Sequence, residues 1–154
     1  MSARPGPVAV IGAGTMGHGI AYAAAIAGFP VTLSDSRADA LPRALERIGE
    51  LLSGGVKRGK LTEADRTAVA ERVRGEPTLA VAVRHADVVV EAVVEDLAVK
   101  RQVFTDVERA ARDRALLATN TSSLSVAAIA SALREPGRLV GMHFFNPVHA
   151  MKLV

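Results

Sequence analysis

The sequence predicts an α/β fold in which a doubly wound, mainly parallel sheet carries helices on both faces. Short apolar runs rich in β-branched residues alternate with segments of helical periodicity, which is typical of this architecture. The first apolar run leads into a glycine-rich turn and a helix, the order found in a βαβ unit. The 154 residues suit one domain, so we expect a single unit over residues 1–154.

Composition excludes several classes of function. The chain is 49% hydrophobic and 23% charged, as in ordinary globular proteins. It has no cysteine, which excludes disulfides, thiolate zinc sites and a cysteine nucleophile and agrees with a reducing, cytoplasmic location. We expect no metal site. A net charge of +3 with 3% aromatic residues gives no basis for nucleic-acid binding.

A secretory signal or a membrane helix is the alternative for the start of the chain, because residues 5–34 hold no charged side chain. Two features oppose it. Glycines interrupt what should be a leucine-rich core, and the segment ends in the turn residues Gly28, Phe29 and Pro30. We therefore expect no membrane partner.

The first three predicted elements form the βαβ unit. Residues 8–11 are an apolar run that predicts a strand buried on both faces. Apolar side chains recur at three- and four-residue spacing over residues 15–27, which predicts a helix that stops at Gly28. Residues 31–34 predict a second strand, parallel to the first and joined to it by a right-handed connection.

The remaining elements continue the alternation. Residues 38–52 have the pattern of an amphipathic helix, which a glycine-rich basic break over residues 53–60 ends. Thr62 and the acidic residues after it predict the start of a helix that reaches about Val73. A weak pattern predicts a short strand at residues 77–79. Clearer patterns in the second half predict strands at 87–93, 115–119 and 138–144, and helices at 97–112 and 125–133.

Residues 12–17 match the pattern G-x-G-x-x-G between a predicted strand and a predicted helix, the context of a Rossmann-type dinucleotide fingerprint. Gly12 permits the tight turn, Gly14 lets a pyrophosphate approach the backbone, and Gly17 lets the helix pack on the strand. Backbone N–H groups at the helix start are expected to bind the phosphates. The residues that supply them are Ala13, Thr15 and Met16.

Asp35 ends the second predicted strand, about 20 residues beyond the fingerprint. Its carboxylate suits the ribose hydroxyls of adenosine and repels a 2′-phosphate, which favours NAD over NADP. Arg37 keeps the alternative open, because an arginine here either binds a 2′-phosphate or stacks on adenine. NAD is the expected cofactor.

Four stretches of sequence carry a family resemblance. They are VIGAGTMGHGIA at residues 10–21, VEAVVED at 90–96, NTSSL at 120–124 and HFFNPV at 143–148. With them the chain resembles the NAD-binding domain of the L-3-hydroxyacyl-CoA dehydrogenases, over nearly its whole length. The resemblance implies an enzyme of fatty acid metabolism that oxidises an L-3-hydroxyacyl-CoA to the 3-ketoacyl-CoA with NAD.

The same resemblance implies roles for residues at the reacting end. His143 is the base that takes the proton of the 3-hydroxyl, and an imidazole with a reference pKa of about 6.5 suits that transfer. Ser122 hydrogen-bonds the substrate oxygen and lies beside the cofactor and the acyl-CoA. The alternative for the hydroxyls of residues 120–123 is to cap the next helix. Asn146 orients the His143 segment or the cofactor.

Four basic residues and one glutamate complete the residues that the resemblance singles out. Glu95 and Lys100 match family positions beside the cofactor, and the alternative for Lys100 is a solvated surface charge. Lys57 and Arg58, with Lys60, lie where the family contacts the phosphates of coenzyme A, since cations suit that polyanion. The alternative there is a solvated basic loop.

The end of the chain departs from the family pattern. The resemblance implies that the glutamate that pairs with the family's catalytic histidine would directly follow Val154, and we expect the helical substrate and dimerisation domain to be absent. We therefore expect a separately encoded helical domain, or a homodimer through it, as partner. The alternatives are a non-catalytic module that binds NAD and acyl-CoA, or a dehydrogenase of a related 3-hydroxyacid. His149 replaces the family's usual proline, while His18 and His85 are expected at the surface or in packing.

Overall fold

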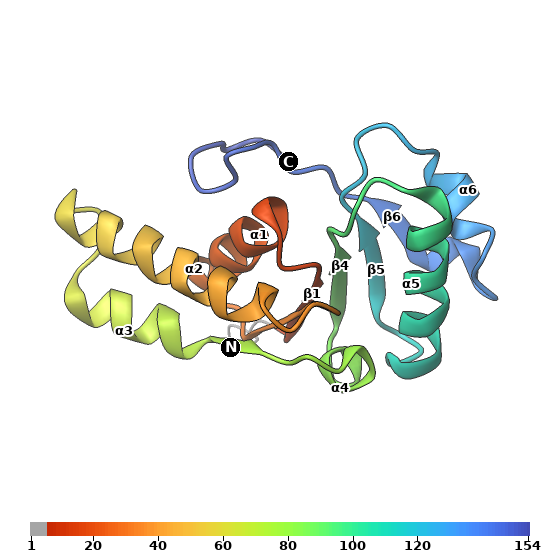
Figure 1. Ribbon diagram of the computed structural model, residues 1–154, viewed down its shortest axis with the longest axis horizontal. Coiled ribbons are helices and arrows are strands. Elements are labelled where there is room, and N and C mark those ends of the chain that lie inside the picture. The colour runs from red at the N-terminus through yellow and green to blue at the C-terminus, as the bar shows by residue number, and fades with distance from the viewer. Residues whose placement is uncertain (1–5) are drawn as a thin grey trace, which may run out of the picture.

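A computed structural model describes residues 6–154, and it consists of one sheet between two layers of helices (Figure 1). Within these residues, six strands pair in the order β3-β2-β1-β4-β5-β6, and every pair is parallel. The strands are β1 (Val8–Ile11), β2 (Val31–Ser34), β3 (Val73–Gly75), β4 (Val88–Glu91), β5 (Leu116–Thr119) and β6 (Leu139–Gly141). The predicted doubly wound α/β fold of the Rossmann type is confirmed.

Helices connect the strands and cover both faces of the sheet. They are α1 (Thr15–Ile26), α2 (Ala40–Lys57), α3 (Glu63–Glu71), α4 (Leu79–Val83), α5 (Leu97–Ala110) and α6 (Val126–Ala130), followed by a 3₁₀ turn at Pro136–Arg138. Helices α1, α2 and α3 lie on one side of the sheet, and α5 and α6 lie on the other (Figure 1).

Two cores result, one on each face, because successive side chains of a strand point to opposite faces. In β1, Val10 belongs to the core under α1 and packs with Ile20. The next residue, Ile11, belongs to the opposite core with Phe104 of α5. All four residues of β1 are buried, which confirms the prediction of a strand covered on both faces, and all four residues of β2 are buried as well.

Helix α2 is longer than predicted, since it continues past Leu52 into the expected break over residues 53–60. Gly55 does not end the helix. A Cβ on Gly55 would lie 2.8 Å from Leu61 Cδ1, so this glycine allows the next loop to pack closely. The chain turns only at Gly59, where a φ of +67° favours glycine.

The strand predicted at residues 77–79 is wrong. The third strand is β3, in which Val73 pairs with Val31 of β2. Thr62 caps α3 as predicted, with its Oγ1 accepting from the Asp65 N–H at 3.0 Å. The helix nevertheless ends at Glu71 rather than near Val73, because pairing with the sheet takes the next residues.

Helix α6 and strand β6 are shorter than the predicted segments 125–133 and 138–144. Ser125 caps α6 by accepting from the Ala128 N–H at 3.2 Å, so the hydroxyls of residues 120–123 do not cap it. Strand β6 ends at Gly141, because its partner β5 ends at Thr119. The residues that follow therefore leave the sheet as a loop.

The order of the strands places a crevice at their carboxyl ends. The chain proceeds from β1 outward to β3 on one side, then returns to β4 and proceeds outward to β6. Ligands of open α/β sheets bind at such a switch point, which lies here between β1 and β4. No helix within residues 6–154 has the length and apolarity to cross a membrane.

Candidate functional site

Two adjoining cavities occupy the crevice above β1 and β4. The first cavity has a volume of about 560 Å³, and the second has about 310 Å³. Three residues line both, namely Met16, Ala92 and Val93. An extended ligand can therefore pass from one cavity into the other without leaving the switch point.

The fingerprint glycines shape the floor of the first cavity. Gly12 has a φ of +100°, and a Cβ there would lie 2.5 Å from the carbonyl oxygen of Ala92. A Cβ on Gly17 would lie 1.6 Å from the oxygen of Gly12, so α1 can approach β1 only with glycine here. Gly14 lines the cavity, and a Cβ on it would meet no atom within 4 Å. The open space at Gly14 is where the fingerprint predicts a pyrophosphate, and the cradle fits that group.

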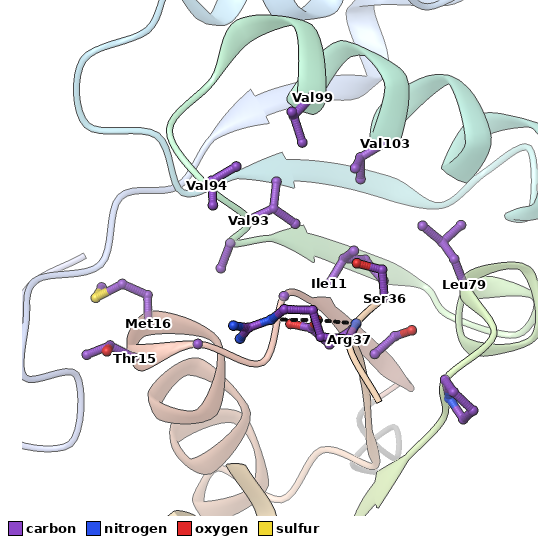
Figure 2. Close-up of a pocket in the computed structure, with 16 residues that line it drawn as sticks. Ile11, Thr15, Met16, Ser36, Arg37, Leu79, Val93, Val94, Val99 and Val103 are labelled. Atoms are coloured by element: carbon purple, nitrogen blue, oxygen red, sulfur yellow. Dashed lines mark hydrogen bonds and ion pairs between the residues drawn. The ribbon is translucent and has the colours of Figure 1, made fainter. Parts of the chain in front are cut away.

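The start of α1 points at this space with the positive end of its dipole. Gly14 is the N-cap and supplies no side-chain hydrogen bond, and the first turn holds no acidic residue. Thr15 and Met16 line the cavity from this turn (Figure 2). The N–H of Ala13 donates to Asp35 Oδ2 at 2.8 Å rather than into the cavity, and a contact of Ala13 with the cofactor stays a prediction.

Asp35 lies at the end of β2 with its carboxylate fixed by the backbone. Oδ2 accepts from the Ala13 N–H and Oδ1 from the Arg37 N–H, both at 2.8 Å. The side chain of Asp35 is only 11% exposed, whereas that of Arg37 is 65% exposed with its Nε 3.6 Å from Oδ1. Asp35 therefore presents a fixed negative charge to the first cavity, and Arg37 lines the same cavity (Figure 2).

An apolar wall faces the fingerprint across the first cavity. Figure 2 shows Val93 and Val94 from the end of β4, Val99 and Val103 from α5, and Leu79 from α4 along this wall. Such a wall suits the flat apolar face of a base, while Asp35 on the opposite side suits hydroxyls.

The second cavity gathers the predicted catalytic residues. His143, Asn146 and Ser122 line it, together with Glu95, Lys100 and Phe145. The imidazole of His143 is exposed, and its centroid lies 4.9 Å from that of the Phe145 ring. Asn120 ties this segment to β5, because its Oδ1 accepts from the Phe144 N–H at 2.8 Å.

The segment that carries His143 rests on α1. Val148 is buried in the core with α1 and lies against Gly19. A Cβ on Gly19 would lie 2.9 Å from the Val148 Cβ, closer than ordinary packing allows. Gly19 lies outside the fingerprint, and its missing side chain decides where the loop after β6 runs.

Glu95 is held as an ion at the mouth of the second cavity. Its Oε1 accepts from the Thr121 hydroxyl and from the N–H groups of Ser122 and Ser123 at 3.2 and 3.3 Å. Partial burial opposes ionisation, but the Thr121 hydroxyl and the Lys100 charge outweigh it and lower the pKa of Glu95 to about 2. The carboxylate thus also fixes the loop that presents Ser122.

Lys100 is buried, so its interpretation as a solvated surface charge is wrong. Its Nζ lies 2.6 Å from Glu91 Oε1 and 3.4 Å from Glu95 Oε2, and it donates to the carbonyl oxygen of Val93 at 3.3 Å. Glu91 also accepts from the Thr119 hydroxyl and the Val93 N–H, both at 2.7 Å. Sequence reasoning missed Glu91 and Thr119 as parts of the site; an acidic residue ending an apolar strand was the available signal.

The basic residues at the end of α2 lie apart from the two cavities. Lys57, Arg58 and Lys60 are exposed, and none of them lines either cavity. Their role toward coenzyme A stays a prediction. His149 and His85 are exposed, and the half-buried His18 has its Nδ1 2.9 Å from the carbonyl oxygen of Gly14. Within the described residues, no cluster of side chains suits a metal ion.

Known proteins are similar to this chain in sequence and in fold. A fatty acid oxidation complex subunit alpha from Ectopseudomonas oleovorans is 46% identical over 147 residues, which are 95% of this chain and 20% of the relative. The structure of 3-hydroxybutyryl-CoA dehydrogenase from Escherichia coli K12 is 42% identical with a TM-score of 0.93, and the match covers 97% of this chain and 32% of that one. The (S)-3-hydroxybutyryl-CoA dehydrogenase from Ralstonia eutropha is 34% identical with a TM-score of 0.91, covering 97% and 52%.

The chain spans about a fifth of the length of the curated relatives it matches, since the matched part is 20% of each. The sequence profile of one family, described as 3-hydroxyacyl-CoA dehydrogenase, NAD binding domain, matches residues 7–154. The predicted family and its cofactor NAD are thereby confirmed. On its sequence, its fold and the cradle at Gly14, the chain belongs to the 3-hydroxyacyl-CoA dehydrogenase family as an NAD-binding domain.

Proposed function

We propose that this chain binds NAD across the two cavities and supplies the cofactor half of an enzyme that oxidises L-3-hydroxyacyl-CoA to 3-ketoacyl-CoA. The observation that supports this most is the pair of adjoining cavities, with Asp35 in the first and His143 in the second. A dinucleotide whose adenosine meets Asp35 and whose pyrophosphate lies at Gly14 brings its nicotinamide to His143. The chemistry that NAD supplies when bound is the acceptance of a hydride from carbon 3.

The residues of the second cavity divide the remaining work. His143 takes the proton of the 3-hydroxyl, a transfer for which an exposed imidazole is suited. Ser122 donates a hydrogen bond to the substrate oxygen, from a loop that Glu95 holds. Asn146 orients the His143 segment or the cofactor from the loop after β6.

The proposal also covers the binding of coenzyme A, the partner of this chain and its location in the cell. Lys57 and Arg58 would bind the phosphates of coenzyme A, with the acyl chain directed toward Ser122. The partner would be a helical domain, encoded separately or joined to this one, or a second copy acting through such a domain. The location is the cytoplasm, as expected from the cysteine-free sequence, and cell fractionation tests it.

A test of the function combines this chain with the helical half of a relative, supplied in cis or in trans. The absorbance of NADH is followed with L-3-hydroxybutyryl-CoA as substrate. We expect turnover that His143→Ala lowers by about 10² or more, because general base catalysis contributes roughly that factor. Turnover that is unchanged in His143→Ala would remove the proposed role of His143.

One observation favours a second candidate, a module that binds NAD and acyl-CoA without turnover. Within residues 6–154, no hydrogen-bond partner holds the ring nitrogens of His143, although a general base normally has an orienting partner. Tight NAD binding without turnover in the reconstituted enzyme would favour this candidate over the dehydrogenase.

A further inference from the structure

Three charged side chains from different elements meet beside the second cavity. Glu91 ends β4, Glu95 lies in the loop that follows, and Lys100 belongs to α5. They form the ion pairs Lys100–Glu91 and Lys100–Glu95 at 2.6 and 3.4 Å. We call these three residues the charge array. Two carboxylates and one ammonium give it a net charge of −1.

The inner pair of the charge array is closed off from solvent. The side chains of Glu91 and Lys100 are 0% and 1% exposed, and both Glu91 oxygens accept further hydrogen bonds, from Thr119 and Val93. Burying such a pair is costly, and apolar residues of similar volume often serve stability equally well. The pair is neutral as a unit, so it leaves the charge of Glu95 uncancelled.

Glu95 carries that charge where a ligand can meet it. Its side chain is 40% exposed and lines the second cavity, whereas Glu91 does not line it and Lys100, which does, is only 1% exposed. The other titratable groups lining this cavity are His143 and Lys100, and Lys100 is paired with Glu91. Hydrogen bonds from the Thr121 and Ser123 hydroxyls hold the Glu95 carboxylate in place and favour its charged form.

We propose that the net negative charge of the array makes the second cavity favour the oxidised cofactor, whose nicotinamide ring is positive, over the reduced cofactor, whose ring is neutral. This inference rests on the proposed function, which places the nicotinamide in that cavity. A carboxylate attracts a cationic ring more strongly in a partly dehydrated cavity than in water. The rest of the dinucleotide is the same in both redox states, so the charge array acts on the difference between them.

The test measures the dissociation constants of NAD⁺ and NADH for this chain by calorimetry and compares their ratio between variants. Glu95→Gln removes the uncancelled charge but keeps an oxygen that accepts the same hydrogen bonds. We expect this variant to shift the ratio against NAD⁺ by about tenfold, the size of a charge interaction at intermediate effective dielectric. An unchanged ratio would overturn the inference.

A double variant separates net charge from direct contact. Glu91→Gln with Lys100→Met replaces the neutral inner pair by neutral side chains and leaves the net charge at −1. The glutamine can accept from the Val93 N–H and donate to the Thr119 hydroxyl, so the buried groups keep partners. We expect a smaller shift of the ratio than in Glu95→Gln, because the net charge of the array stays at −1 although Lys100, which lines the cavity, is replaced. A shift as large as that of Glu95→Gln would contradict a role for net charge.

Two further comparisons complete the design. Glu71→Gln removes an exposed carboxylate of α3 that lines neither cavity, and it should leave the ratio unchanged. Far-ultraviolet circular dichroism establishes that each variant is folded, and Glu95→Gln alone decides the inference should the double variant not fold. A chain that binds neither redox state refutes the proposed function, whereas one that binds both with a ratio independent of Glu95 refutes only this inference.

Discussion

We expect Asp35 to select the cofactor, because the backbone fixes both of its oxygens beside the first cavity. The N–H groups of Ala13 and Arg37 hold them at 2.8 Å, so the carboxylate cannot turn away from a 2′-phosphate. The Arg37 guanidinium is largely exposed, and its Nε lies only 3.6 Å from Asp35 Oδ1. The carboxylate therefore partly neutralises the positive charge of Arg37.

Replacement of Asp35 by alanine should therefore narrow the preference for NAD over NADP by at least about tenfold, since one repulsive charge is lost and Arg37 is freed. Calorimetric titration of both cofactors measures this. Asp113→Ala, an exposed change outside both cavities, serves as the control. Equal affinities of the original chain for the two cofactors would contradict the role of Asp35.

Glu95 should also make the free energy of unfolding depend on pH. Partial burial opposes its ionisation, but hydrogen bonds and Lys100 prevail and lower the pKa of Glu95 in the folded chain from 4.5 to about 2. A depressed folded pKa means that this stabilisation is present above about pH 4.5 and is lost as the pH falls toward 2. Urea unfolding between these values should show a smaller loss of stability in Glu95→Gln than in the original chain. Equal slopes would show that the carboxylate contributes nothing to the folded state.

At the scale of elements, the turn from β1 into α1 contains glycines that are needed for two different reasons, close packing and space for a ligand. A side chain on Gly17 would collide with backbone, so Gly17→Ala should destabilise the fold by about 2 kcal/mol or more. A side chain on Gly14 would meet only open space, and its φ of −76° is ordinary for any residue. The Gly14→Ala variant should therefore be as stable as the original chain but bind NAD more weakly.

Urea unfolding and NAD titration on both variants distinguish these expectations. Gly49→Ala provides the reference, because this exposed glycine of α2 also has open space around its Cβ position but lies outside both cavities. Loss of stability in Gly14→Ala to the extent of Gly17→Ala would contradict the assignment of the open space to a ligand.

The elements that sequence reasoning predicted best are those whose pattern is decided locally. Residues 8–11 and 31–34 are apolar enough to be central strands wherever they pair, and both strands have these bounds. The end of α2 and the position of β3 depend on contacts made elsewhere. Gly55 is explained by Leu61, and Val73 is a strand residue only because β2 lies beside it. Single-sequence patterns carry neither fact.

At the scale of the molecule, the site is assembled from both halves of the chain. The fingerprint and Asp35 were predictable, because their spacing reflects one βαβ unit. The motif around His143 was also predictable by resemblance, and the structure brings it to the second cavity with Ser122 and Glu95. The buried link from Lys100 to Glu91 was not, because it depends on how α5 packs against the end of β4.

We expect this chain alone to bind NAD but to oxidise L-3-hydroxybutyryl-CoA very slowly. His143 is exposed, and within the described residues its ring packs beside Phe145 but has no hydrogen-bond partner. Orientation of reacting groups contributes up to about 7 to 11 kcal/mol, so its loss should reduce the rate by several orders of magnitude. Stopped assays for NADH compare the chain with the same chain plus a helical half. Rapid turnover by the chain alone would show that residues 6–154 orient His143 sufficiently.

The contact between Val148 and Gly19 limits how this domain can be recombined with its relatives. Helix α1 and the loop after β6 come from opposite ends of the chain, yet the bare backbone of the helix at Gly19 leaves the space that the valine fills. We therefore expect a chimera with a crossover between these positions to fold poorly when it combines a side chain larger than glycine at 19 with valine at 148. In a library made by shuffling related genes, the chimeras that fold should therefore carry residues 19 and 148 from the same parent.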